Sequence, residues 1–389
     1  MSNTFRPRIA YYCARDPLDK RSWSGITYYL GKSLQKHIGE VYYLGPVKVP
    51  WLLDMPMRCI QKLTKLILKK EWAPSFSLLR NMYMALLLKK KMKKDSYDFL
   101  FAPAAASELA YLKTKVPIVY FGDATFKSYT ESYEEFKDLN AFSRWEGDYL
   151  EKKALRKSDI VIFASNWAAQ SAIRDYGIQE DKIKVLLMGA NMDNVPDSHI
   201  ITKKEENKVL TLLFLGVDWE RKGGPLACET LKSLRSMGIQ TKLIVCGVVP
   251  PSEFINPFIE VIPFLNKNKE EDHERFVRIL SSTHFLLIPT RADCSLLVNN
   301  EANAFGVPTI TTNVGGVADV VKDGVNGYCL PFMAGGAEYA TLIASIYQDK
   351  CRYHQLALSS RKRFEEVLNW DSFSQQLKNV LTQRHLYSI

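Results

Sequence analysis

Short apolar runs alternate with amphipathic stretches along most of the chain. Apolar runs bounded by glycine, proline or polar loops are typical of buried strands in a parallel sheet. Such runs occur at residues 8–13, 40–47, 97–103, 116–122, 159–165, 182–188, 209–216, 241–247, 258–265 and 284–290. Apolar positions at helical spacing separate several of them, at residues 26–37, 166–178, 225–237 and 270–282. Strands that alternate with helices predict an α/β fold.

The length of the chain predicts two domains. Its 389 residues, of which 47% are hydrophobic, are enough for two cores of ordinary size. The polar, unpatterned segment at residues 194–208 is the predicted linker. The seven cysteines are scattered and form no C-x2-C pair, so the sequence predicts neither a disulfide framework nor a zinc site. We therefore expect a reducing, cytoplasmic environment.

No apolar run at the N-terminus has the length of a signal peptide, and no stretch approaches the roughly 20 apolar residues of a spanning helix. We therefore expect a soluble or peripheral protein. The net charge of +10 is concentrated in an insertion at about residues 50–95. Residues 55–94 alone hold eleven Lys and Arg against a single acid, Glu71.

The basic insertion has helical character. Ile60, Leu63 and Ile67 separate partly from the cations at helical spacing, and Trp51 and Trp72 flank this stretch. This pattern resembles an interfacial helix on anionic lipid, at the inner face of the cytoplasmic membrane. The predicted docking residues are Lys62, Lys65, Lys69, Lys70, Lys89, Lys90, Lys91, Lys93 and Lys94. The alternative is a packed helical pair with solvated lysines. No nucleic-acid-binding motif accompanies the patch, so nucleic acid is a poorer explanation.

Two loops of the first half carry candidate chemistry. Ser24-Gly25 lies between a strand and a helix, where backbone N–H groups can meet an anion, although it also reads as an ordinary turn. Asp123 follows the strand at 116–122. Its carboxylate either contacts a substrate hydroxyl or acts as a base, or it caps the next helix.

The second half begins with a strand, Gly216, and the run Arg221-Lys222-Gly223-Gly224 before a helix. Two cations beside a glycine-flexed helix start can hold a diphosphate, and a bound anion would explain cations that oppose the helix dipole. The alternative is a solvated basic turn. Further along, Asp293 and Glu301 lie eight residues apart around a helix start. Carboxylates suit sugar or ribose hydroxyls, although Glu301 also reads as a solvated helix residue.

The chain resembles the family 4 retaining glycosyltransferases, which have the GT-B fold of two facing Rossmann-like domains. The resemblance rests on Gly216, the RKGG run and, above all, D-x7-E followed by EANAFGVPTITTNVGGVADVVKDGVNG. It covers nearly the whole chain in order. It implies an acceptor-binding domain at 1–195, a donor-binding domain at 208–368 and a final helix at 369–389 that packs back on the first domain.

The resemblance also implies residue roles. Arg221 and Lys222 would bind the donor diphosphate, Glu301 would hold the ribose, and Asp293 would face the donor sugar. The implied donor-binding residues are Gly25, Gly216, Arg221, Lys222, Asp293, Ser295, Leu296, Leu297 and Glu301. The predicted catalytic residues are Asp123, Asp293, Arg221 and Lys222.

Three positions depart from the family pattern. Asp293 stands where the family usually has Glu, Val217 stands where many members have Arg, and Asp123 stands where many have His. The shorter carboxylate of Asp293 changes its reach toward the donor sugar.

These features predict a retaining transferase that moves a sugar from a nucleotide diphosphate sugar to a hydroxyl of a glycan or lipid-linked acceptor. The sequence has no D-x-D-type metal motif in a suitable loop, so we predict metal-independent transfer without a cofactor. Two alternatives stay open. One is a GT-B-fold sugar-nucleotide epimerase, which needs no acceptor, and the other is an inactive scaffold docked at the membrane.

Overall fold

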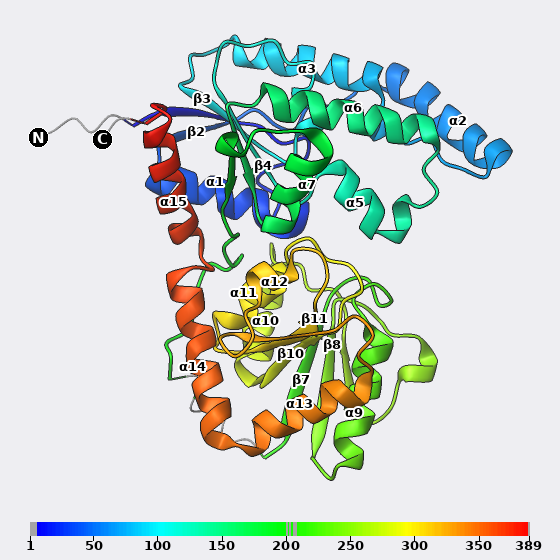
Figure 1. Ribbon diagram of the computed structural model, residues 1–389, viewed down its shortest axis with the longest axis vertical. Helices are drawn as coiled ribbons and strands as arrows, with labels where there is room; N and C mark the ends of the chain where they lie inside the picture. The colour runs from blue at the N-terminus through cyan, green and yellow to red at the C-terminus, as the bar shows by residue number, and fades with distance from the viewer. Residues whose placement is uncertain (1–5, 200, 202–203, 205–207, 388–389) are drawn as a thin grey trace, which may run out of the picture. The chain divides into compact units, whose positions relative to one another are not determined.

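The computed structural model describes residues 6–199, 201, 204 and 208–387, so the predicted linker at 194–208 lies partly outside the described residues. The chain forms two compact units. The first contains residues up to Leu186 and those from Ser374 onward, and the second is Leu187–Phe373. Each unit contains a six-stranded parallel sheet with helices packed against it (Figure 1). The predicted α/β fold is confirmed.

The first sheet has the strand order β2-β1-β3-β4-β5-β6. Its central strands are entirely buried apolar runs, as expected where helices cover both faces of a parallel sheet. The strands are β1 (Arg8–Tyr11), β2 (Glu40–Tyr43), β3 (Phe99–Pro103), β4 (Ile118–Gly122), β5 (Ile160–Phe163) and β6 (Ile183–Val185). The helices are α1 (Ile26–His37), α2 (Trp51–Leu68), α3 (Leu78–Met92), α4 (Ala106–Leu109), α5 (Phe126–Ser132), α6 (Ala141–Lys157) and α7 (Asn166–Tyr176).

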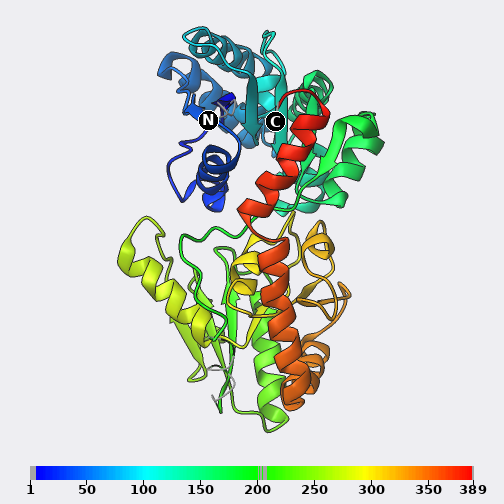
Figure 2. The same cartoon turned by 90° about the vertical axis from the view of Figure 1, so that its left-hand side faces the viewer.

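The second sheet has the order β12-β11-β10-β7-β8-β9. Figure 2 shows α9 and α10 on opposite sides of this sheet. The strands are β7 (Leu210–Leu215), β8 (Thr241–Cys246), β9 (Ile259–Ile262), β10 (Phe285–Ile288), β11 (Thr309–Thr312) and β12 (Gly327–Leu330). The helices are α9 (Gly224–Ser236), α10 (Glu270–Ser282), α11 (Leu297–Asn303), α12 (Val317–Val320), α13 (Gly336–Gln348) and α14 (Lys350–Glu366).

The boundary between the units differs from the predicted one at residue 195. Residues from Leu187 onward belong to the second unit. There the N–H of Ala190 donates to the carbonyl of Leu368 at 3.0 Å, and the indole of Trp370 donates to Asn191 at 2.9 Å. These contacts tie the chain that leaves β6 to the end of the second unit.

The last helix, α15 (Trp370–Gln383), begins in the second unit, and its residues from Ser374 onward group with the first. Within the first unit, the hydroxyl oxygens of Ser374 and Ser33 of α1 lie 2.7 Å apart. Arg384, which follows α15, forms an ion pair with Asp181 at 3.2 Å.

Candidate active site

The strand order of the second sheet places a topological switch point between β7 and β10. From β7 the chain moves outward to β8 and β9, and it then returns to β10, β11 and β12 on the other side. Ligands of open parallel sheets bind at the carboxyl ends of strands beside such a point. Gly216 follows β7, and Asp293 lies in the loop after β10. The two predicted site segments therefore start from neighbouring strands.

A buried ion pair joins these two segments. The Nζ atom of Lys222 donates to a carboxylate oxygen of Asp293. Only 12% of the Lys222 side chain and 11% of the Asp293 side chain are exposed. Opposite charges that are largely shielded from water attract each other more strongly than charges at the surface. The structure therefore brings together two predicted catalytic residues that lie far apart in the sequence.

The pair keeps Asp293 ionised despite its burial. Burial alone would raise the pKa of the Asp293 carboxyl, but the charge of Lys222 and its hydrogen bond oppose this rise. Arg221 and the N–H of Leu296 add smaller contributions, so the pKa lies below its ordinary value. At neutral pH Asp293 is therefore a carboxylate, in contact with Lys222.

Arg221 lies beside this pair. Its Nε donates to Asp218 at 3.2 Å, and one terminal nitrogen donates to the carbonyl of Ala292 at 3.0 Å. The carbonyl of Arg221 accepts from the N–H of Arg291 at 2.7 Å, which holds the two loops against each other. Asp218 was missed in the sequence, although it lies only three residues before Arg221. An acidic residue three positions before a cation in a turn indicates a local ion pair, and this spacing could have identified Asp218.

Two glycines allow the loops to meet closely. Gly223, the residue before α9, has φ of 79°, and a Cβ there would lie 2.1 Å from the carbonyl oxygen of Pro289. Gly315 has φ of 53°, and its Cβ would lie 2.1 Å from the carbonyl oxygen of Asp293. Any other residue at these positions would clash with backbone. The glycines of the sequence motif thus position the loops that carry Lys222 and Asp293.

The predicted backbone donors lie at the start of α11. Leu296 has a left-handed conformation with φ of 33°, and its N–H donates to Asp293 at 3.2 Å. Leu297 is the first residue of the helix. Ser295 is buried, with its hydroxyl 4.0 Å from the sulfur of Met188. Because the Leu296 N–H is bonded to Asp293, it becomes available to a phosphate only if that contact opens.

Glu301 of α11 forms a second buried ion pair. Its carboxylate accepts from Nζ of Lys267 at 2.5 Å, and its side chain is 3% exposed. Burial raises the pKa of the Glu301 carboxyl, and Lys267 offsets part of that rise. The interpretation of Glu301 as a solvated helix residue is therefore wrong. Lys267 was missed because it lies in the loop before α10, where no spacing relates it to Glu301.

The first unit places its predicted residues at the carboxyl edge of its own sheet. Gly25 caps α1 with φ of 90°, and the two residues before it, Trp23 and Ser24, also have positive φ. Asp123 follows β4 and accepts from the indole N–H of Trp23 at 3.3 Å. The residue that caps α5 is Thr125, whose side chain accepts from Ser128. The interpretation of Asp123 as the cap of that helix is therefore wrong.

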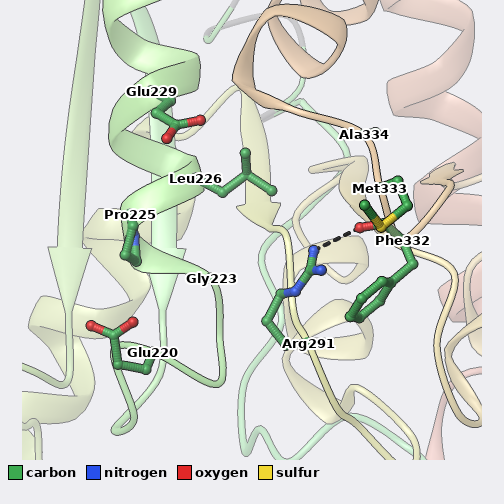
Figure 3. A pocket seen from close by; sticks show the side chains of 9 residues that line it. All are labelled: Glu220, Gly223, Pro225, Leu226, Glu229, Arg291, Phe332, Met333 and Ala334. Carbon is green, nitrogen blue, oxygen red and sulfur yellow. Dashed lines mark hydrogen bonds between the residues drawn. The ribbon is translucent and has the colours of Figure 1, made fainter.

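A pocket of about 360 Å³ lies beside the start of α9 (Figure 3). In it, Arg291 donates to the carbonyl of Phe332 at 2.8 Å, and its guanidinium lies 3.6 Å from the centre of the Phe332 ring. The lining residues are Glu220, Gly223, Pro225, Leu226, Glu229, Arg291, Phe332, Met333 and Ala334. None of them belongs to the predicted site. Two carboxylates line the pocket, so its charge does not favour a diphosphate.

The basic insertion forms the helices α2 and α3 of the first unit (Figure 1). Most of the predicted docking lysines are exposed, but Lys91 donates to the carbonyls of Leu44 at 2.6 Å and Pro46 at 3.1 Å. Trp72 does not flank the helix at the surface. It is buried and donates to Glu146 at 2.7 Å. Within the described residues, no helix combines the length and apolar character needed to cross a bilayer.

Within the same residues, no three His, Cys, Asp or Glu side chains are grouped to hold a metal ion. Metal-independent transfer without a cofactor stays a prediction, and activity in the presence of a chelator tests its metal part directly.

Several known proteins are similar to this chain in sequence. An uncharacterized 41.2 kDa protein from the cps region of Klebsiella pneumoniae is 28% identical over 47% of this chain and 51% of its own length. Glycogen synthase from Mycobacterium tuberculosis is 24% identical over 71% of this chain and 65% of its own length. The chain thus spans between about half and two thirds of these relatives.

Solved structures share the fold over nearly the whole chain. Sucrose-phosphate synthase from Thermosynechococcus elongatus gives a TM-score of 0.68 at 17% identity, covering 98% of this chain and 99% of that one. Anabaena HepE, solved in complex with UDP-glucose, gives 0.62 at 14% identity, covering 97% and 100%. These neighbours identify the two Rossmann-like domains as the GT-B fold.

Two family models match consecutive parts of the sequence. Residues 29–194 match Glycosyltransferase Family 4, and residues 197–363 match Glycosyl transferases group 1. Together these matches span most of the chain, and they divide it close to the boundary between the two units. The chain is therefore a member of the family 4, group 1 glycosyltransferases, with the GT-B fold.

Proposed function

We propose that this glycosyltransferase transfers a sugar from a nucleotide diphosphate sugar to an acceptor hydroxyl, with retention at the anomeric carbon. The observation that carries the proposal is the Lys222–Asp293 ion pair beside Arg221 at the switch point of the second sheet. It combines cations for a diphosphate with a carboxylate for sugar hydroxyls. The complex of HepE with UDP-glucose supports a donor of this class.

Each residue has a defined task in this proposal. Negative charge accumulates on the departing diphosphate, and the ammonium of Lys222 and the guanidinium of Arg221 stabilise it. Donor binding separates Lys222 from Asp293, which frees the carboxylate for hydroxyls of the transferred sugar. No metal ion or cofactor is required, because the two cations neutralise the leaving group.

The nucleotide ribose is assigned to Glu301. Its carboxylate lies on the same short helix whose start follows Asp293, and two oxygens can accept from two neighbouring hydroxyls. Ribose binding exchanges the contact with Lys267 for contacts with the hydroxyls. Backbone groups around Gly216 and Ser295–Leu297 complete the donor site proposed in the second unit. The donor contact of Gly25, in the first unit, stays a prediction from the family resemblance.

The acceptor is assigned to the first unit, where Asp123 would bind its reacting hydroxyl. The basic surface of α2 and α3 supports docking to an anionic membrane, at the inner face of the cytoplasmic membrane. A protein held at that surface would meet a lipid-linked saccharide. The proposed location is therefore the cytoplasm, with peripheral attachment to the membrane.

The test is a panel of nucleotide diphosphate sugars, assayed for nucleotide release with and without a lipid extract as the source of acceptor. We expect release from one donor, increased by the extract and unchanged by a chelator. NMR of the product should show the anomeric configuration of the donor. Release that depends strictly on an acceptor would exclude the epimerase, and binding of a nucleotide sugar without hydrolysis or transfer would favour the inactive scaffold.

A further inference from the structure

Helix α2 contacts the first unit through its polar side. Met57 is the buried residue of this helix. On the same side, Gln61 donates to Glu71 at 2.5 Å, and the hydroxyl of Thr64 accepts from the N–H of Trp72 at 3.2 Å. These three residues follow one another at intervals of four and three, so they form one face of the helix. That face is held to the protein mainly by hydrogen bonds.

The opposite face of α2 is apolar and points away from the protein. At about 100° per residue, Leu52, Leu63 and Leu66 lie on the side opposite Met57 and Thr64. Their exposed fractions are 67%, 52% and 78%. The exposed apolar residues of the helix are Trp51, Leu52, Met55, Ile60, Leu63, Leu66, Ile67 and Leu68. The helix is thus inverted relative to a surface helix that packs its apolar side on the core.

The neighbouring helix α3 has the usual orientation. Its buried residues include Met84, Ala85 and Leu88, which face the first unit. Helix α3 also exposes apolar side chains, at Leu79, Met82 and Leu86, but unlike α2 it buries a second apolar side in the first unit. An apolar surface of this extent on one helix marks an interaction site.

Charge indicates what covers this face. Arg58, Lys62 and Lys65 follow along its edge at intervals of four and three. The acids near them are Asp54, paired with Arg58, and Glu71, which lies 3.7 Å from Lys65. A second copy of this chain would bring its own row of cations to the interface. An anionic lipid surface supplies opposite charge and an apolar layer together.

We propose that α2 inserts its outward apolar face into the headgroup and acyl boundary of an anionic bilayer. This inference rests on the proposed membrane docking and extends it, because the lysines alone would hold the protein only above the headgroups. The helix lies in the plane of the interface, with Leu52, Leu63 and Leu66 buried in lipid and the cations at the phosphates.

The test uses the full chain and vesicles of phosphatidylcholine with phosphatidylglycerol. The variant Leu63→Ser/Leu66→Ser should bind at least about a hundredfold more weakly, since each leucine contributes about tenfold or more on burial. The control is Leu358→Ser, which changes an exposed leucine of α14 in the second unit and should bind like the wild type.

A second measurement reports insertion directly. Vesicles with brominated acyl chains should quench the fluorescence of Trp51. The quenched part of the fluorescence should be absent from the Trp51→Phe variant. Salt should weaken binding, as should Lys62→Gln/Lys65→Gln. Unchanged binding of the double serine variant, or no quenching of Trp51, would overturn insertion.

The remaining outcomes also decide the proposal. Binding that depends only on the lysines would leave docking electrostatic and overturn insertion. A lipid-free dimer that the serine variant dissociates would assign the face to a second copy. Failure to bind any vesicle would overturn docking and insertion together, whereas nucleotide release from a donor tests glycosyl transfer independently.

Discussion

The topological switch points of the two sheets lie at different strands. The residues beside the two switch points also differ in their chemistry. In the first sheet the order reverses between β1 and β3, and in the second between β7 and β10. Beside the first point lie the Trp23–Gly25 turn and Ala104, which has φ of 49°. Beside the second lie Arg221, Lys222 and Asp293.

This difference indicates a division of tasks. The second sheet offers buried charges, which suit a diphosphate and its sugar. The first offers glycine, an aromatic ring and strained backbone, which suit an uncharged hydroxyl compound. Asp123 is the exception, because its carboxylate follows β4 and is held by Trp23. The following predictions challenge this division, beginning with the largest expected effect.

Removing a cation of the second site should reduce turnover most. We expect Arg221→Ala and Lys222→Ala each to lower kcat by about 100- to 1,000-fold, because each removes a charge that stabilises the leaving diphosphate. Nucleotide release at saturating donor measures the effect. The control is Lys242→Ala, which changes an exposed lysine of β8 paired with Glu260. Unchanged turnover in both variants would contradict the assignment of the diphosphate to this site.

Glu301→Gln should weaken nucleotide binding by about tenfold, which corresponds to 1.4 kcal/mol. The physical reason is the loss of charged hydrogen bonds to ribose hydroxyls. Calorimetry with nucleoside diphosphates measures the affinity, and the matched control is Glu260→Gln, which changes an exposed carboxylate of β9. The effect should shrink for the 2′-deoxy or 3′-deoxy nucleotide. If Glu301→Gln weakened the binding of both deoxynucleotides as much as that of the ribonucleotide, Glu301 would act by supporting the fold.

The smallest effect is expected in the first unit. Asp123→Asn should raise the KM for acceptor about fivefold, as one weakened hydrogen bond would, and leave the KM for donor unchanged. Trp23→Phe removes the indole donor to Asp123 and should change the same constant in the same direction. Initial rates with varied acceptor measure both. A loss of kcat of about 100-fold or more would instead identify Asp123 as a general base and break the division of tasks.

The sequence predicted the fold, and it predicted that Arg221, Lys222 and Asp293 lie near one another, for a clear reason. Buried parallel strands read as apolar runs, and the loops that follow them reach the same edge of the sheet. Arg221, Lys222 and Asp293 could therefore be placed together before any contact was known. Lys267 could not, because its loop precedes α10 and a buried ion pair leaves no periodic signal.

Like the Lys267–Glu301 ion pair, the orientation of α2 could not be predicted from the sequence. An amphipathic pattern shows that a helix has an apolar side, but not which side the rest of the protein covers. Gln61, Thr64 and Trp72 decide this through contacts that depend on the loop after the helix. Trp72 is buried because Glu146 accepts its indole N–H, and residues so far apart in sequence give no such hint.

The Lys222–Asp293 contact has a consequence for selectivity. While the site is empty, each charge is compensated by the other, so the site carries little net potential to attract small anions. Inorganic phosphate that replaced Asp293 at Lys222 would repel the released carboxylate through its own negative charge, and an uncompensated buried charge is costly. A sugar diphosphate supplies both an anion and hydroxyl donors. We therefore expect the Lys222–Asp293 contact to favour a ligand that carries both an anionic group and hydroxyl groups over inorganic phosphate.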